Sequence, residues 1–317
     1  MLTRAAVILT FAAALCSAAA ADPSASQPAC REGALVSAKS AKVLVRYSSR
    51  LGATGRRPPL LPGSDAVADG YGGWYLAGLG LAHLLHDGKL DRSWHAELQR
   101  RLAPATLQRV GARLYVSDRR RVFALDAATG RKLWASPLVV RGHGILALAA
   151  NGTTVYAGGI FGLVAGQPRL GLAAFDARSG HVLPWRPPRL FFYRGSTPAP
   201  NLSANDGVNA IVPVGRLVLV GANEAGGAYD AGTGSRLKGF ASLFNANAVD
   251  VHGQTAYVGG TIRSSVPVHN LLAVDLRSRT GQRRPWFPTL ANYVNVSRIA
   301  ASGDRVFVGG DFCSSLG

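Results

Sequence analysis

An aspartate, a threonine, a glycine and a tryptophan occur at fixed spacing in the stretch ALDAATGRKLW, from Ala124 to Trp134. Residues of these types can serve a cofactor, a catalytic step or only the fold. An aspartate at the head of a tight turn accepts hydrogen bonds from backbone N–H groups, threonine can reinforce it, and glycine supplies the positive φ that closes the hairpin. This chemistry needs no ligand.

The same signature recurs along the chain. The strand-like motifs TVYAGG, TAYVGG and RVFVGG carry their second glycine at Gly159, Gly260 and Gly310, so the repeating unit is close to 50 residues. Each tryptophan can dock on the neighbouring unit and give its N–H to a backbone acceptor, with Phe240 standing in where the tryptophan is absent. We therefore predict a structural docking role for these residues: Asp126, Thr129, Gly130, Trp134, Asp176, Gly180, Trp185, Asp230, Gly234, Asp275, Gly281 and Trp286.

The elements that must position these residues are short strands. The chain has 317 residues, 48% of them hydrophobic, with 38 Gly, 17 Pro and only 16% charged residues, which favours an all-β fold rich in turns. Four short strands in each unit, with turn signals between them, are typical of a β-sandwich, a barrel or a β-propeller.

The stretch Ala124 to Trp134 resembles the tryptophan-docking motif of quinoprotein-type β-propellers, and VYAGGIFGLVAGQPRLGLAAFDARSG resembles the delta-60 propeller repeats of secreted bacterial proteins. The resemblance covers roughly residues 63–317 and implies a propeller of about six four-stranded blades. Two blades lack the Gly-Gly pair. The last blade ends at GGDFCSSLG, so it is either incomplete or closed by an N-terminal strand, for which AKVLVRYSS from Ala41 is the candidate.

The resemblance also implies a rival function, a quinoprotein-like or degenerate propeller enzyme with its site at the central channel. The chain has no adjacent cysteines to lie over a quinone, and its 17 acidic residues suggest no set of calcium ligands. The seven histidines lack the spacing of a metal site, and His83 and His86 are expected at the surface or in loops. We expect no catalytic residues, no cofactor and no metal.

The N-terminal residues have the pattern of a secretory signal peptide, with a basic start, an apolar run and small residues before a cut near Ala21. An uncleaved anchor is the alternative, and no other segment is apolar enough to cross a membrane. Removal of residues 1–21 leaves Cys30 and Cys313, which form a disulfide or stay as two unrelated thiols. Residues 22–62 are then a linker with the closing strand, and residues 63–317 the propeller repeats.

The formal net charge is +18, and the loss of Arg4 with the signal peptide leaves +17. Such a surface attracts polyanions. The longest connection in the repeats interleaves arginine with aromatic residues, which favours anionic polymers, glycans or protein partners; these candidate binding residues are Arg186, Arg189, Phe191, Phe192, Tyr193 and Arg194. The alternative is that LFFY forms another strand or packs under the propeller.

The sequence thus predicts a secreted or envelope-located propeller that binds a partner without converting it, with no preference for a nucleic-acid sequence. A scaffold module within a longer envelope protein is a further alternative.

Overall fold

The computed structural model describes residues 32–37, 43–48, 65–77, 80–98, 106–140, 142–188, 193–194, 197–198, 207–223, 226–243, 245–260, 270–278, 280–286, 288 and 295–311. All regular structure within these ranges is β-strand. No helix in this part of the chain is long and apolar enough to span a membrane. The predicted signal segment, Cys30 and Cys313 lie outside the described residues. The chain divides into two compact units, residues 64–237 and residues 1–63 with 238–317.

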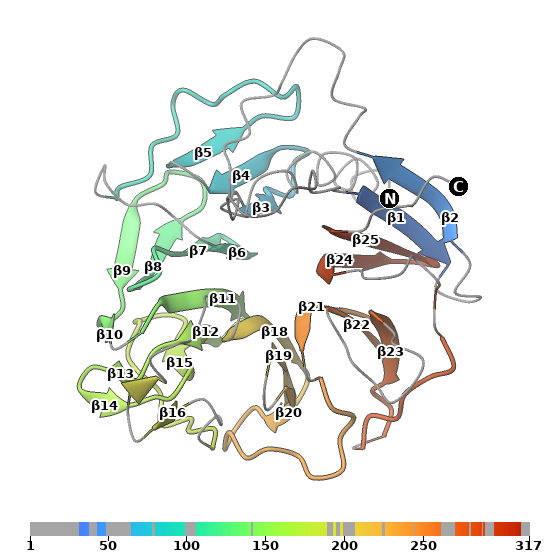
Figure 1. Cartoon of the computed structure of the whole chain (residues 1–317). Coiled ribbons are helices and arrows are strands. Elements are labelled where there is room, and N and C mark those ends of the chain that lie inside the picture. Colours follow the sequence, from blue (N-terminus) through green and yellow to red (C-terminus); the bar gives the residue numbers. More distant parts are fainter. Residues whose placement is uncertain are drawn as a thin grey trace, which may run out of the picture. The chain divides into compact units, whose positions relative to one another are not determined.

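The unit formed by residues 64–237 contains four main antiparallel sheets in chain order (Figure 1). The first strand of each sheet packs beside the first strand of the next sheet, so β3, β6, β11 and β18 lie side by side. The sheets are β3 (Asp65–Ala68), β4 (Trp74–Ala77) and β5 (Leu81–Leu84); β6 (Thr106–Val110), β7 (Arg113–Ser117), β8 (Val122–Asp126) and β9 (Lys132–Ala135); β11 (Gly144–Ala150), β12 (Thr154–Ile160) and β15 (Leu172–Asp176); β18 (Val208–Val214), β19 (Leu217–Ala222) and β20 (Gly227–Asp230).

A full fourth strand, β9, is present in only one of these four sheets, within the described residues. In the other three sheets the outer position is reduced to one bridge: Leu84 with Leu90, Phe175 with Val182 and Tyr229 with Arg236. Two small sheets complete the unit: β10 (Val139–Val140) with β13 (Leu163–Val164) and β14 (Gln167–Pro168), and the hairpin β16 (Tyr193–Arg194) with β17 (Thr197–Pro198).

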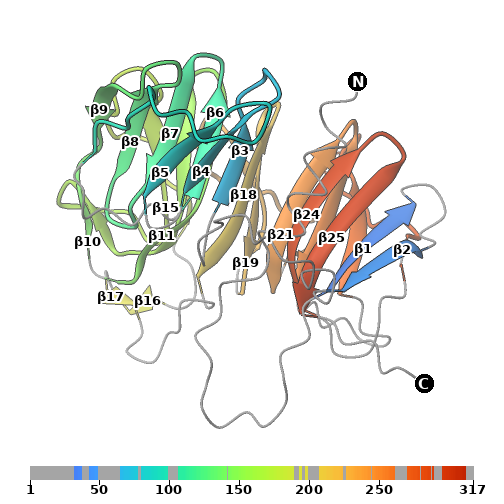
Figure 2. The same ribbon diagram turned by 90° about the horizontal axis from the view of Figure 1, so that it is seen from above.

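The other unit has a three-stranded sheet, β21 (Ala246–His252), β22 (Thr255–Gly260) and β23 (Leu271–Asp275), and a four-stranded sheet in the order β2-β1-β25-β24. The four strands are β2 (Val43–Ser48), β1 (Glu32–Ser37), β25 (Arg305–Asp311) and β24 (Asn295–Ser302), and they lie in one layer in Figure 2. Strand β1 runs antiparallel to β25 from Glu32 opposite Gly310 to Ser37 opposite Arg305. The N-terminal segment therefore supplies two strands of this sheet, β1 beside β25 and β2 at the edge.

The Gly-Gly pairs let neighbouring backbones approach closely. A Cβ on Gly158 would meet the side chains of Val208 and Ile211 from the next sheet, and a Cβ on Gly159 would meet the carbonyl oxygen of Gly144. Strand β11 has a bulge opposite these glycines, between Ile145 and Ala147. The first glycine therefore permits sheet-to-sheet packing, and the second permits the bulged strand to lie close.

In the sheets that begin with β6, β11, β18 and β21, the second and third strands are buried along most of their length, and every residue of β22 is buried. Strands β4 and β5 of the first sheet are only partly buried. Within residues 64–237 the β11 sheet packs between the β6 and β18 sheets, so both faces of its strands are covered and their sequences read as continuous apolar runs. Within residues 64–237 one core cluster forms around Tyr156, Trp185 and Tyr229, and another around Tyr115, Trp134 and Phe175.

Candidate binding surface

The Asp126–Gly130 turn is held by its own side chains. The backbone N–H and the hydroxyl of Thr129 both donate to Asp126 Oδ1, at 2.9 and 2.8 Å, and Gly130 has a φ of +74°. The Thr129 hydroxyl and backbone N–H hold the pKa of Asp126 below its usual value. The carboxylate is therefore engaged in closing the turn.

Two further turns repeat this geometry. Ser179 donates to Asp176 Oδ1 through its N–H at 2.7 Å and its hydroxyl at 2.8 Å, and Thr233 does the same for Asp230 at 2.8 and 3.1 Å. Gly180 and Gly234 close these turns with φ of +75° and +81°.

Asp275 departs from the pattern. Its carboxylate pairs with the guanidinium groups of Arg277 and Arg284, at 2.5 and 3.2 Å, and Arg277 holds its pKa well below the usual range. Gly281 still has a positive φ of +53°, and the ring of Phe240 lies where its Cβ would be. The fifth repeat thus keeps the contact to an aromatic ring and replaces the Thr or Ser donor by arginine.

Tryptophan side chains connect successive sheets of the unit formed by residues 64–237. The indole N–H of Trp94 donates to the carbonyl oxygen of Ala127 at 2.9 Å, and those of Trp134 and Trp185 donate to Ala177 at 3.2 Å and Asp230 at 2.9 Å. Each acceptor belongs to the Asp turn of the following sheet. In the other unit, Trp286 is buried against Tyr257, with ring centroids 5.0 Å apart.

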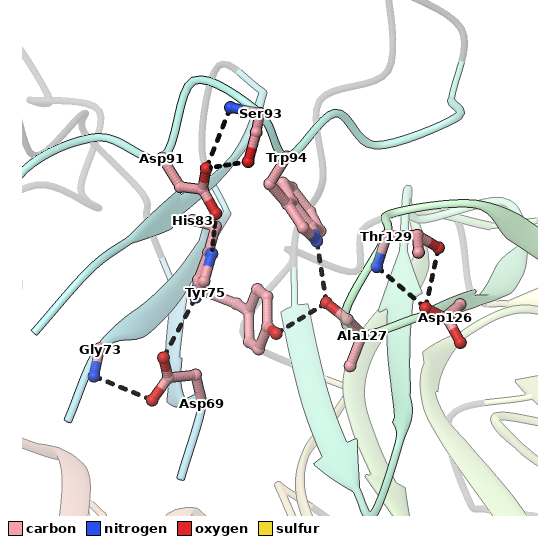
Figure 3. Close-up of polar contacts among 10 residues, drawn as sticks. All are labelled: Asp69, Gly73, Tyr75, His83, Asp91, Ser93, Trp94, Asp126, Ala127 and Thr129. Carbon is pink, nitrogen blue, oxygen red and sulfur yellow. Dashed lines mark hydrogen bonds and ion pairs between the residues drawn. The ribbon is translucent and has the colours of Figure 1, made fainter. Parts of the chain in front are cut away.

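A tyrosine from the second strand accompanies each of the first two tryptophans. The Tyr75 hydroxyl donates to the same Ala127 oxygen as Trp94, at 2.7 Å (Figure 3), and Tyr115 shares the Ala177 oxygen with Trp134. These residues are occupied by docking, so they offer no free group for catalysis.

A partly buried cluster of one histidine and two aspartates in the first sheet was not predicted from the sequence. The two ring nitrogens of His83 face Asp91 Oδ2 at 2.9 Å and Asp69 Oδ2 at 3.1 Å, and the ring stacks on Tyr75 at 4.6 Å (Figure 3). The expectation of a surface histidine is wrong for His83, whose side chain is only 12% exposed. Strand β5 turns this ring inward, whereas His86, two residues beyond the strand, is exposed.

Chemically, the cluster places one imidazole between two carboxyl groups. Each ring nitrogen lies within hydrogen-bond distance of one aspartate oxygen, and an imidazole nitrogen can donate or accept such a bond. Asp69 also accepts the backbone N–H groups of Tyr71 and Gly73, and Asp91 accepts those of Ser93 together with its hydroxyl. The cluster ties the hairpin of the first two strands to the chain that follows β5, which is a structural role.

Acid should weaken this sheet. The Ser93 hydroxyl and His83 lower the pKa of Asp91 to about 2; for Asp69, burial raises the pKa, but the N–H groups of Tyr71 and Gly73 and the His83 ring outweigh it. A carboxyl whose pKa is lower in the folded protein than in the unfolded chain stabilises the fold at pH values above its unfolded pKa of about 3.9. This stabilisation is lost as the pH falls through the pKa of the folded state. We expect the urea midpoint to fall between pH 5 and pH 2, and to fall less in Asp91→Asn.

Asp304→Asn, in the exposed β24–β25 turn, is the control for that series. In this variant the urea concentration at the unfolding midpoint should fall with acid by the same amount as in the wild type. An Asp91→Asn protein with the full wild-type pH dependence would contradict the assignment.

The predicted aromatic and arginine connection is only partly described. Arg186 directly follows Trp185 and is exposed, while Arg189, Phe191 and Phe192 lie outside the described residues. Tyr193 and Arg194 form β16, with Tyr193 opposite Pro198 and Arg194 opposite Thr197. Part of the LFFY stretch is therefore a short strand.

The described residues do not fit a calcium-assisted quinone site. No group of three or more His, Cys, Asp or Glu side chains that could hold a metal occurs among them. Asp126, Asp176 and Asp230 are engaged by turn N–H groups, and the cysteines, Cys16, Cys30 and Cys313, are not adjacent in sequence.

Arginines of the unit formed by residues 64–237 lack acidic partners. Among its described residues, the ion pairs are those of His83 and Lys89, and no arginine lies within 4.0 Å of a carboxylate oxygen. The arginines concerned are Arg92, Arg109, Arg113, Arg119, Arg120, Arg121, Arg131, Arg169, Arg178, Arg186, Arg216 and Arg236. The exposed arginines of this set therefore have no carboxylate in direct contact, although Arg131 and Arg216 lie close enough to Asp126 and Asp230 to lower the pKa of those carboxyls.

Repeated antiparallel sheets, joined through tryptophan and an Asp-turn carbonyl, define a protein of the PQQ-like β-propeller class. The chain belongs to the family described as outer membrane protein assembly factor BamB, whose model matches residues 87–311. No curated protein matches the chain.

Three solved structures are similar to the chain at low identity. BamB from Moraxella catarrhalis is 13% identical, with 87% of this chain and 90% of that chain covered and a TM-score of 0.42. The Neurospora crassa Pan2 WD40 domain is 11% identical, with 91% and 98% covered and a TM-score of 0.49. The computationally designed Ika4 protein is 15% identical, with 51% and 86% covered and a TM-score of 0.37.

Proposed function

We propose that this protein is a non-enzymatic binding or scaffold module whose partner is anionic: a polymer, a charged glycan or an acidic protein surface. The absence of carboxylate partners around the described arginines of residues 64–237 carries this proposal. Because surface cations displace the counterions that are condensed on a polyanion, such binding is favourable at low salt. The arginines around Arg186 are the candidate contact residues.

The proposal includes the architecture and the location. We propose about six blades, the last one completed by β1 and β2, and a kinship to the delta-60 repeats of secreted bacterial proteins. The description of the family as an outer membrane protein assembly factor supports an envelope location and a partner-binding role. Residues 1–21 would then act as the signal peptide.

Replacement of the connection arginines tests the proposed surface. We expect Arg186→Ala/Arg189→Ala/Arg194→Ala to weaken heparin binding about tenfold or more at 50 mM salt, since the loss of even one charge-assisted contact removes roughly 1.5 kcal/mol. Fluorescence anisotropy with labelled heparin, and with neutral dextran for comparison, measures this change.

The matched control removes the same charge elsewhere. Arg92, Arg178 and Arg216 are exposed residues of the same unit, and their triple alanine variant should lose much less affinity. Equal losses in the two triple variants would show that net charge alone binds heparin, and would overturn the assignment of the surface to this connection.

A further inference from the structure

Arg169 carries a buried guanidinium with no acidic partner. It directly follows β14 and is only 3% exposed. Its N–H groups donate to the carbonyl oxygens of Pro168 at 3.0 Å and Leu183 at 3.2 Å, and to Gln167 Oε1 at 3.2 Å, while its Nε has no hydrogen-bond partner. All three acceptors are uncharged, so the hydrogen bonds leave the positive charge uncompensated.

A second arginine lies beside it. Arg186 Nη2 is 3.4 Å from the same Gln167 Oε1 that accepts from Arg169. Burial lowers the pKa of Arg169, and the charge of Arg186 lowers it further. In the part of the chain that the structure describes, no carboxylate oxygen lies within 4.0 Å of either guanidinium.

This arrangement is costly without a counterion. Buried charged groups in proteins are normally paired, because the desolvation of a lone ion costs several kcal/mol. Here two cations share one neutral amide oxygen, which satisfies hydrogen bonds but not charge.

We propose that Arg169 and Arg186 form a binding site for a single oxyanion group, a sulfate, phosphate or carboxylate, at the position where Gln167 Oε1 now accepts from both. This inference deepens the proposed function by naming one subsite. It rests on that function only for the identity of the molecule that carries the anionic group. Gln167 and Arg186 are exposed, so an anion can reach Arg186 from solvent and meet Arg169 where Gln167 Oε1 now lies. An oxyanion accepts from both guanidinium groups and replaces Gln167 Oε1 as their common acceptor.

Access to the pair depends on a tight hairpin. Strands β13 and β14 are joined by Ala165 and Gly166, with φ of +51° and +75°, so the turn is a two-residue loop with both residues in the left-handed region. The hairpin fixes the backbone of Gln167, an exposed residue whose Oε1 lies within hydrogen-bond distance of both guanidinium groups. We expect the ligand to enter by displacing this amide side chain.

The test uses the full chain and inorganic probes. Calorimetric titrations with sulfate, phosphate and acetate, with chloride making up a constant ionic strength, should give saturable binding for at least one probe. Sulfate or phosphate binding would indicate a tetrahedral oxyanion as the natural group, and acetate binding a carboxylate. NMR of the arginine side chains should show the Nε–H resonance of Arg169 moving with the same dissociation constant.

Exposed Arg186→Gln is the main variant because it leaves the buried side chain in place. It should bind the best probe at least about tenfold more weakly, as expected for the loss of a charge-assisted contact. Arg178→Gln, which removes an exposed arginine from the neighbouring Asp176 turn, should bind like the wild type.

Absence of saturable binding for all three probes, or equal binding by Arg186→Gln and wild type, would overturn the site. Heparin binding measured in parallel separates this result from the proposed function. If the inorganic probes fail while heparin still binds, the subsite is wrong and the binding role stands; if the probes bind and heparin does not, the subsite stands and the polymer role fails.

Discussion

Trp134→Ala is expected to lower the free energy of unfolding by about 3 to 5 kcal/mol, the usual cost of truncating a buried tryptophan to alanine. Trp134 is 9% exposed, its ring lies tilted against that of Tyr115 with centroids 5.9 Å apart, and its indole N–H donates to the Ala177 oxygen of the next sheet. A Cβ on Gly180 would come within 2.5 Å of this ring, so glycine leaves room for it. Loss of the ring opens a cavity between two sheets.

Trp134→Phe separates packing from the hydrogen bond. It keeps most of the ring contacts, and the Ala177 oxygen retains the Tyr115 hydroxyl as a donor at 3.2 Å, so we expect a loss of about 1 kcal/mol from the missing bond together with a smaller packing loss. Leu133→Ala, at an exposed position of the same strand, is the control. Urea unfolding should rank the three variants in that order, and a Trp134→Ala midpoint equal to that of Leu133→Ala would refute inter-sheet docking.

A disulfide between Cys30 and Cys313 is expected to stabilise the protein by about 3 to 5 kcal/mol in the chain-entropy model, because it closes a very long loop. Both cysteines lie outside the described residues. The register of the neighbouring strands favours the pairing: Glu32, two residues after Cys30, lies opposite Gly310, and β25 ends at Asp311, two residues before Cys313. The bridge would fasten β1 to the last sheet.

Thiol labelling of the denatured, unreduced protein, produced by secretion with residues 1–21 removed, should find no free cysteine. Cys30→Ser, Cys313→Ser and the double variant should lose the same stability, because each removes the same bond. Two labelled thiols in the wild type, or losses in the single variants that add up in the double variant, would exclude the disulfide.

The local features of the fold could be predicted from sequence because short-range chemistry determines them. The turn at Asp126 follows from an acceptor and a glycine a few residues apart, and the 50-residue period indicates repeated β-sheets. The expected strand near Ala41 corresponds to β2, but β1 was missed, since its pairing with β25 depends on residues at the other end of the chain. The extent of the outer strands also could not be predicted: among the described residues, the outer position of four sheets is a single bridge.

The candidate site was harder to predict from the sequence than the fold. Arg186 was singled out from the composition of its connection, whereas Arg169 is one arginine in a short hairpin, and nothing local signals that it becomes buried. His83 was misjudged because its partners, Asp69 and Asp91, are brought together only by the sheet. Burial and long-range proximity decide both cases, and neither has a signature in residue spacing.

The most direct test of the central claim is the salt dependence of heparin affinity. The claim is that arginines without a carboxylate partner bind an anionic partner molecule. If six or more anionic groups are engaged, the association constant should fall by about a thousandfold or more between 50 and 200 mM salt, with a linear dependence of its logarithm on the logarithm of salt concentration. An absence of heparin binding at 50 mM salt, or an affinity that does not change with salt, would contradict the claim.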